Sequence, residues 1–261
     1  MARKLGRTEF LLTTDIKTEI ERRFQQKPQA FFKMPFVRNL VAMDRLRSVS
    51  VDEMEVADQI DPGAIENALE YNKEMLRNIE NHKQTLERPQ LLIDALTSIY
   101  YIVKNKGVLK VLCVGPRTES EFLMLLAEDF HPDNIRGLDL ISYSDYVDVG
   151  DMHHMPYDDD SFDIVFLGWV LTYSRDLQRV ADECVRVAKP GGYIAVSVES
   201  EAVRDDTEVY GVTVDDVIVI KSTDEILELF KDHIHAVPFR HEVHRSLRDT
   251  LDMVMVVIEL I

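Results

Sequence analysis

The segment Val114 to Glu121 carries charged side chains at a position suited to ligand binding. It reads Val-Gly-Pro-Arg-Thr-Glu-Ser-Glu and follows an apolar run, where a nucleotide-binding α/β protein usually places several glycines. The Arg117 guanidinium can form two parallel hydrogen bonds with a carboxylate, and Glu119 or Glu121 can accept from an ammonium group. Side chains of this turn can therefore hold both charges of a small ligand.

The turn is also predicted to be ordered. Gly115 supplies conformational freedom and Pro116 fixes one backbone dihedral. Thr118 is a good helix N-cap, and Glu121, three residues later, completes a capping box. We therefore expect a helix to begin directly after the turn, over about residues 119–129.

The elements that must position this turn alternate between strand and helix. Apolar runs predict strands and amphipathic runs predict helices; the strands are 108–114, 135–140, 162–167 and 193–198, and the helix after the third is 175–188. Ser222 and Glu225 predict a further capped helix, followed by strands near 236–244 and 251–260. Strand, helix and strand in repetition indicate crossover units and a doubly wound, mostly parallel sheet.

The first third of the chain follows a different pattern. Pro28 and Pro35 interrupt irregular helices, and Asp61-Pro62-Gly63 is predicted to start a helix with Asp61 as N-cap. Another helix is expected from near Pro89 to Gly107, where glycine ends it. No strand is predicted before residue 108. We therefore divide the chain into a helical extension, residues 1–88, and an α/β domain, residues 89–261.

Composition limits the classes of partner. Residues 1–50 hold 11 basic and 5 acidic residues, a balance of +6, whereas the remaining 211 hold 19 basic and 42 acidic residues, a balance of −23. An acidic body repels phosphate backbones, which argues against a nucleic-acid substrate. No run reaches the roughly 18 apolar residues of a membrane span, and the start lacks a signal-peptide core, so a cytoplasmic protein without membrane contact is expected. Cys113 and Cys184 are predicted to be buried apolar filler.

Three segments, taken together, carry a family resemblance. The first is Asp139, which ends the second strand. The second is the run Gly150-Asp151-Met152-His153-His154-Met155-Pro156, which is followed by Asp160-Ser161-Phe162-Asp163. The third, which comes before the next strand, is the run Arg186-Val187-Ala188-Lys189-Pro190-Gly191-Gly192. In order and spacing they resemble the class I S-adenosylmethionine-dependent methyltransferases, in particular the small-molecule, type 11-like branch. The resemblance covers about residues 90–260. It implies a Rossmann-like sheet of seven strands with the last one antiparallel, and S-adenosyl-L-methionine as cofactor.

The resemblance also implies a role for each matching residue. Asp139 would receive the ribose hydroxyls, since one carboxylate can accept both protons. Asp151 would accept from the adenine amino group, the Met152 backbone would bind the neighbouring ring nitrogen, and Leu140 and Met152 would sandwich the ring. Gly168 and Trp169 would face the methionine part and the substrate. All follow strands at their carboxyl ends, where open α/β sheets bind ligands.

The first turn departs from the family pattern. The family has an acidic residue and then three alternating glycines, whereas here Cys113 takes the acidic position, Gly115 keeps the first glycine, and Arg117 and Glu119 replace the others. In one interpretation Arg117 binds the methionine carboxylate while Glu119 or Glu121 binds its ammonium, with Gly115, Pro116 and Thr118 shaping the turn. In the other, the domain is a catalytically inactive binding or regulatory protein. A nicotinamide dehydrogenase is disfavoured, because no Gly-x-Gly-x-x-Gly follows the first strand.

Substrate chemistry is less defined by the sequence. Methyl transfer is an in-line displacement that needs a general base only if the acceptor must lose a proton. His153 is the first candidate for a base and Tyr173 the second. No metal site is expected, since the acidic turn 158–160 lacks the spaced oxygen ligands of a calcium loop. The acceptor is expected to be a small molecule or a sugar-type hydroxyl, methylated on oxygen or nitrogen, and a protein acceptor stays open as an alternative. The N-terminal helices are expected to form a lid or a homodimer contact.

Overall fold

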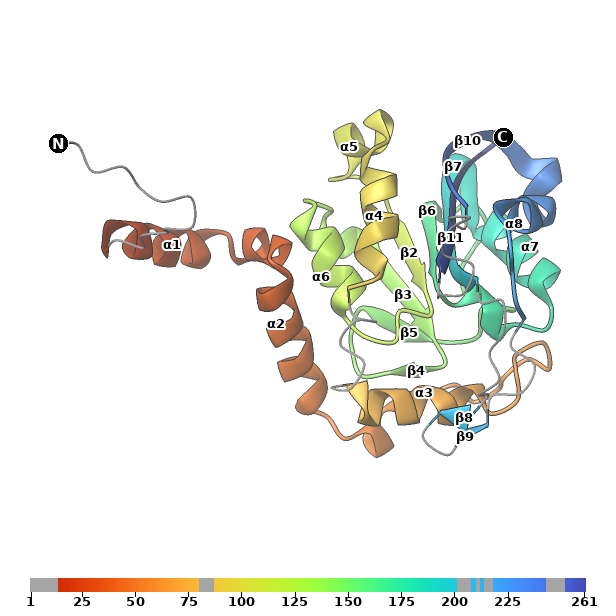
Figure 1. Ribbon diagram of the computed structural model, residues 1–261, viewed down its shortest axis with the longest axis horizontal. Helices are drawn as coiled ribbons and strands as arrows, with labels where there is room; N and C mark the ends of the chain where they lie inside the picture. Colours follow the sequence, from red (N-terminus) through yellow and green to blue (C-terminus); the bar gives the residue numbers. More distant parts are fainter. Residues whose placement is uncertain (1–13, 80–86, 201–207, 210–211, 214–217, 243–251) are drawn as a thin grey trace.

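A seven-stranded sheet forms the centre of the molecule (Figure 1). The computed structural model describes residues 14–79, 87–200, 208–209, 212–213, 218–242 and 252–261. The sheet order is β10-β11-β7-β6-β2-β3-β5, and the strands are β2 (Val111–Val114), β3 (Ile135–Asp139), β5 (Val147–Val149), β6 (Phe162–Gly168), β7 (Ala188–Ser200), β10 (Ile234–His241) and β11 (Asp252–Leu260). Only β11 pairs antiparallel, with both of its neighbours. The predicted mostly parallel, doubly wound sheet with an antiparallel last strand is confirmed.

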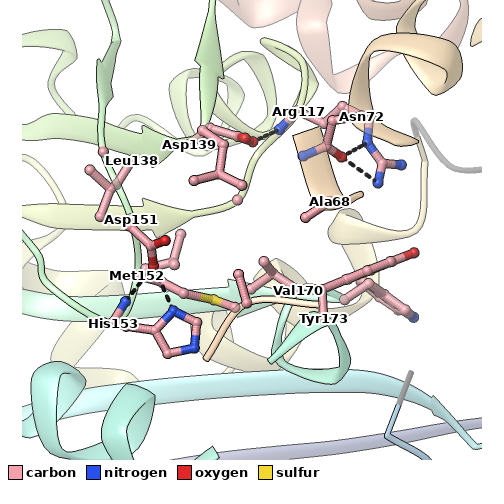
Figure 2. Close-up of a pocket in the computed structure, with 16 residues that line it drawn as sticks. Ala68, Asn72, Arg117, Leu138, Asp139, Asp151, Met152, His153, Val170 and Tyr173 are labelled. Atoms are coloured by element: carbon pink, nitrogen blue, oxygen red, sulfur yellow. Dashed lines mark hydrogen bonds and ion pairs between the residues drawn. The ribbon is translucent and has the colours of Figure 1, made fainter. Parts of the chain in front are cut away.

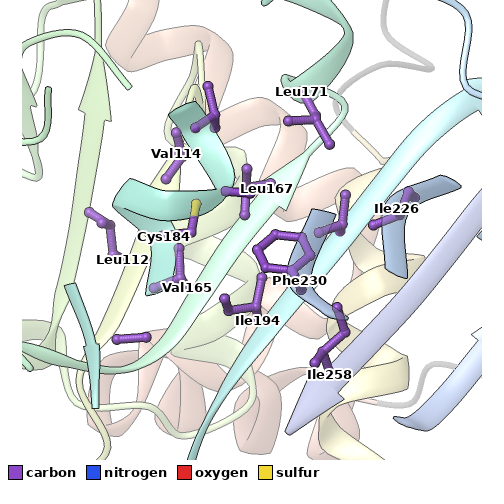
Figure 3. Packing of buried hydrophobic residues seen from close by; sticks show 14 of the residues in the cluster. Leu112, Val114, Val165, Leu167, Leu171, Cys184, Ile194, Ile226, Phe230 and Ile258 are labelled. Carbon is purple, nitrogen blue, oxygen red and sulfur yellow. The ribbon is translucent and has the colours of Figure 1, made fainter. Parts of the chain in front are cut away.

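Helices cover both faces of this sheet because its strands are apolar on both sides. One layer holds α4 (Pro89–Thr97), α5 (Tyr100–Asn105) and α6 (Ser120–Ala127); the other holds α7 (Leu177–Val187) and α8 (Thr223–Phe230). Figure 3 shows the second layer, where Cys184 and Phe230 pack on Leu112, Val165 and Ile194. Cys113 lies in the opposite layer, and both cysteines are buried and free, as predicted.

The N-terminal segment wraps from one side of the sheet to its carboxyl edge. It comprises α1 (Thr14–Gln26), η1 (Pro28–Lys33), α2 (Pro35–Arg47), η2 (Val51–Glu53) and α3 (Ala68–Arg77). Figure 1 shows α1 extending away from the body and α3 lying across the end of the sheet. A two-residue strand, β1 (Glu55–Val56), pairs with β4 (Ile141–Ser142), contrary to the expectation of no strand here. Two residues are too few for an alternating pattern to be read from sequence.

Two predicted helix N-caps are wrong, and one of them also misplaces the start of its helix. α3 begins at Ala68, whereas Asp61-Pro62-Gly63 forms a turn in which the Gly63 N–H donates to Asp61 Oδ1 at 2.7 Å. The capping side chain therefore closes a turn instead of a helix. α6 begins at Ser120 after Glu119, with no side-chain cap, and Thr118 accepts only a 3.4 Å bond from the Ser120 N–H. The predicted cap at α8 is confirmed, since Ser222 accepts from the Glu225 N–H.

The remaining described elements are short. They are η4 (Pro132–Asn134), η5 (Leu171–Tyr173), η6 (Lys231–His233), β8 (Glu208–Val209) and β9 (Val212–Thr213). Of these, η5 matters for the site, because it follows β6 at the carboxyl edge of the sheet and carries Tyr173.

Candidate functional site

A cavity of about 580 Å³, including its open mouth, lies at the carboxyl ends of β2, β3 and β6 beneath α3 (Figure 2). Open α/β sheets bind ligands at this edge. The cavity brings together nine residues predicted from sequence, namely Gly115, Arg117, Asp139, Leu140, Asp151, Met152, His153, Trp169 and Tyr173. Five other predicted residues, Pro116, Thr118, Glu119, Glu121 and Gly168, do not line it.

The turn after β2 forms one wall of the cavity. Gly115 has φ +67°, and a Cβ there would collide with Val170, so only glycine fits. Arg117 has φ +48°, which a side chain disfavours. Strain of about 1–3 kcal/mol per such residue tends to persist at functional sites. The surrounding structure therefore keeps Arg117 in a left-handed conformation that its side chain disfavours.

The Arg117 side chain crosses from this turn to α3. Its Nε and Nη2 donate to Asn72 Oδ1 at 3.2 and 3.1 Å (Figure 2). Its guanidinium carbon lies 5.5 Å from the Tyr71 ring centroid. Within the described residues it forms no ion pair with a carboxylate. A partly buried guanidinium with only neutral partners attracts an anion.

Asp139 stands at the end of β3 with its carboxylate against the turn. The Arg117 N–H donates to Asp139 Oδ2 at 3.0 Å, and the side chain is only 6% exposed. Burial raises the pKa of Asp139, while the N–H groups of Arg117, Leu140 and Ile141 oppose that rise. A buried carboxylate with lone pairs left over is suited to accept hydroxyl hydrogens.

Asp151 and His153 belong to a buried hydrogen-bond chain. His153 Nδ1 lies 2.6 Å from Asp151 Oδ1, and His153 Nε2 lies 2.7 Å from Ser174 Oγ. Asp151 Oδ2 accepts from the Asp61 N–H at 2.9 Å. Burial would raise the pKa of Asp151, but the hydrogen bonds from His153 hold it below the ordinary value. Both ring nitrogens of His153 thus have protein partners, which leaves the ring little capacity as a general base.

Tyr173 and Trp169 close the opposite side of the cavity. The Tyr173 hydroxyl donates to the Tyr71 hydroxyl at 3.2 Å, with the two rings 5.5 Å apart. Trp169 has φ +60° and its backbone N–H donates to Ser197 O at 2.9 Å. An aromatic wall therefore joins α3 to the segment after β6.

The two glutamates predicted to bind an ammonium group point elsewhere. Glu119 is buried, where it pairs with Arg45 and accepts from Ser144 Oγ at 2.5 Å. Glu121 lies beneath the sheet edge beside Cys113, and burial raises its pKa to about 8. Neither carboxylate therefore lines the cavity.

The remaining predicted residues shape the turn from behind. Pro116 is buried and close to Gly137, while Thr118 and Glu119 line a separate, smaller depression beside Tyr143. Gly168 ends β6 just before Trp169 and packs against Glu121. Because none of these side chains lines the main cavity, they can affect a ligand there only by fixing the backbone of the turn after β2 and of the end of β6.

Sequence reasoning missed the cover of the cavity. The cover consists of Ala64, Ala68 and Asn72, and the other residues missed are Val114, Leu138, Gly150 and Val170. The three cover residues recur at four-residue steps, the one signal that could have identified them as a face. The signal is weak because this segment matches no motif and α3 begins only at Ala68, so the predicted helix does not include Ala64.

Among the described residues, no group of three or more His, Cys, Asp or Glu side chains is arranged to hold a metal ion. No helix in the described part of the chain is long and apolar enough to cross a membrane.

The sheet order, the antiparallel last strand and a cavity beside Asp139 define a Rossmann-like fold of the methyltransferase type. Residues 118–196 match the family model described as a methyltransferase domain. This segment, less than a third of the chain, is thus similar to a methyltransferase domain.

Individual proteins are similar to parts of the chain. Malonyl-[acyl-carrier protein] O-methyltransferase 1 of Coxiella burnetii is 30% identical over 144 residues, which are 53% of this chain and 48% of that protein. Demethylmenaquinone methyltransferase of Lactobacillus johnsonii is 42% identical over 52 residues, 20% of this chain and 21% of that one. The PH0226 protein of Pyrococcus horikoshii OT3 superposes with a TM-score of 0.46 at 18% identity, over 64% of this chain and 88% of that one. The matches thus span about half of the first curated relative and about a fifth of the second.

Proposed function

We propose that this protein transfers a methyl group from S-adenosylmethionine to an oxygen or nitrogen atom of a small-molecule acceptor. The observation that carries the proposal is the position of Asp139, a buried carboxylate at the end of β3 that faces a ligand-sized cavity next to a strained turn. Two relatives are named as methyltransferases, one of an acyl-carrier-bound malonyl group and one of demethylmenaquinone. The proposed acceptor shares with those two acceptors only that the methylated group is a small organic molecule.

The lining residues fit the cofactor. Asp139 has acceptor capacity for the ribose hydroxyls, and Asp151 Oδ2 retains a lone pair for the adenine amino group beyond its bond from Asp61. Leu140 and Met152 provide apolar surface for the adenine ring. Arg117, without a carboxylate partner, is the side chain for the methionine carboxylate. Such binding requires the guanidinium to share or leave Asn72.

The bound cofactor would supply a methyl group on a positively charged sulfur. The protein would contribute alignment and exclusion of water, because an in-line displacement depends on both. Ala64, Ala68 and Asn72 cover the cavity from the N-terminal segment, and the Ile65 N–H donates to Tyr173 O at 3.1 Å. In this proposal residues 1–88 act as a lid, and His153 positions Asp151 instead of removing a proton.

A second candidate is a binding protein without turnover. The observation in its favour is that Glu119 is sealed in an ion pair with Arg45, so it cannot bind an ammonium group without breaking that pair. A titration with S-adenosylmethionine followed by a search for methylated products separates the two functions.

The direct test is calorimetry with S-adenosylmethionine. We expect saturable binding, and Asp139→Asn should weaken it about 10- to 100-fold, since a hydrogen bond to a charged group is worth about 1.5–3 kcal/mol. Asp145→Asn, at an exposed residue outside the cavity, is the matched control and should bind as the unchanged protein does. No heat at millimolar cofactor from folded protein would refute the proposal.

A further inference from the structure

Asn72 brings a polar side chain from the N-terminal segment into the cofactor cavity. It lies one turn after Ala68 on α3, and both residues line the cavity; among the described residues of that segment, Asn72 is the one polar side chain that does so. Ligand cavities hold a few placed polar groups among apolar ones, and these groups fix the orientation of the ligand. A polar residue in the cover is therefore a candidate for recognising the ligand.

The contact with Arg117 determines how the Asn72 amide is turned. Nε and Nη2 of Arg117 both donate to Asn72 Oδ1, at 3.2 and 3.1 Å. A guanidinium has donors and no acceptor, so the atom that faces it must be the amide oxygen and not the amide nitrogen. Figure 2 shows the nitrogen, Nδ2, on the side of the amide away from the guanidinium.

The amide nitrogen is left for a ligand. Within the described residues, Asn72 Nδ2 forms no hydrogen bond. The guanidinium polarises the amide through Oδ1, which strengthens Nδ2 as a donor. The two bonds from Arg117 also hold the amide in one orientation, so less side-chain freedom is lost when a ligand binds.

The charges of the cavity direct the negative end of a ligand to this pair. Among the described residues that line the cavity, Arg117 is the one arginine or lysine, and the two carboxylates are those of Asp139 and Asp151. A ligand carboxylate is therefore attracted to Arg117 and repelled by both aspartates. The bonds to Asn72 leave other N–H groups of the guanidinium for that carboxylate, so Asn72 can stay in place.

We propose that Asn72 recognises the carboxylate in the methionine part of the cofactor, donating from Nδ2 while Arg117 donates beside it. This inference rests on the proposed binding of S-adenosylmethionine. It makes Asn72 a specificity-determining residue that the cover contributes to the cofactor site. Because Asn72 belongs to α3, the same hydrogen bond holds α3 over a cofactor that carries the carboxylate.

The experiment compares two ligands that differ in this carboxylate. Full-length protein is titrated in a calorimeter with S-adenosylhomocysteine and with S-adenosyl-3-thiopropylamine, which keeps the ammonium group but lacks the carboxylate. We expect S-adenosylhomocysteine to bind at least about tenfold more tightly, since a hydrogen bond to a charged group is worth about 1.5–3 kcal/mol.

Variants of Asn72 assign that difference to the amide. Asn72→Ala should weaken S-adenosylhomocysteine about tenfold and leave the binding of the amine unchanged. Asn72→Asp removes the donor and adds a negative charge beside Arg117, so it should weaken S-adenosylhomocysteine further. Glu70→Ala, at an exposed position of the same helix, is the matched control and should bind both ligands as the unchanged protein does.

Hydrogen exchange of α3 tests the second part of the inference. At saturation, S-adenosylhomocysteine should slow exchange of the amides in residues 68–77 more than the amine does, as measured by mass spectrometry. In Asn72→Ala the two ligands should protect these amides equally. Circular dichroism verifies that each variant is folded.

Several results would overturn the inference. They are equal affinity of the unchanged protein for the two ligands, an equal loss of both ligands in Asn72→Ala, and equal protection of α3 by both in the unchanged protein. Unchanged or tighter binding of S-adenosylhomocysteine by Asn72→Ala would also overturn it, since Arg117 would then bind the carboxylate without Asn72. Each of these results leaves the proposed function standing, because S-adenosylhomocysteine still binds. If folded, unchanged protein binds no S-adenosylhomocysteine, the proposed function and this inference are both refuted.

Discussion

Arg117 and Trp169 have backbone angles of φ 48° and 60°, and both side chains line the cavity. Each stands where glycine would be conformationally easier, so each position sacrifices stability for the side chain that it presents. Within the described residues, Arg117 presents a guanidinium without an acidic partner, and Trp169 presents an indole N–H without a hydrogen-bond partner. Both strained positions thus present hydrogen-bond donors on residues that line the cavity.

A substitution at Arg117 separates stability from binding. Arg117→Gly relieves the left-handed strain, so its free energy of unfolding should exceed that of Arg117→Ala by about 1 kcal/mol, measured by urea denaturation. Both variants lose the guanidinium and should bind S-adenosylmethionine about 10- to 100-fold more weakly than the unchanged protein. Full affinity in Arg117→Gly would show that the turn binds through its backbone and not through the side chain.

At the scale of elements, the strands were predictable and the cover was not. Apolar runs located β2, β3, β6 and β7 to within a few residues, because a strand covered on both faces leaves a continuous apolar signal. The cover depends on tertiary contacts instead: Asp61 donates its N–H to Asp151, 90 residues away. Thr118 and Glu121 have the spacing of a capping box. The Glu121 side chain is buried against Gly168 instead, so the box does not form. Local patterns do not record such long-range contacts.

The position of α3 predicts how the cavity can be closed by mutation. Ala68 lines the cavity from the first turn of α3, so Ala68→Phe should place a ring where the cofactor binds and weaken S-adenosylmethionine binding more than tenfold in calorimetry. Glu70→Phe, exposed on the same helix, adds the same ring outside the cavity and should leave affinity unchanged. Unchanged binding in Ala68→Phe would place the cofactor away from α3 and refute the lid.

At the scale of the whole molecule, charge and shape separate the first fifty residues from the rest. They carry +6 against −23 for the remainder. α1 has no buried residue in the structure and extends from the body (Figure 1). The ion pairs Lys27–Asp129 and Lys33–Glu128 tie the following η1 to the end of α6, but exposed pairs of this kind contribute little stability. A 13-residue helix is marginal alone, so α1 is expected to pack on another surface.

We propose that this surface belongs to a second copy of the chain. Ile20 and Phe24 lie one turn apart on α1 and are 42% and 46% exposed, and the basic segment is attracted to the acidic body of its partner. Analytical ultracentrifugation at tens of micromolar should give a dimer that weakens at high salt, since screening reduces the attraction. The double variant Ile20→Asp, Phe24→Asp should be monomeric, whereas Val108→Asp, at an exposed site on the body, should remain dimeric. A monomeric unchanged protein, or a dimer that survives the double variant, would exclude α1 as the interface.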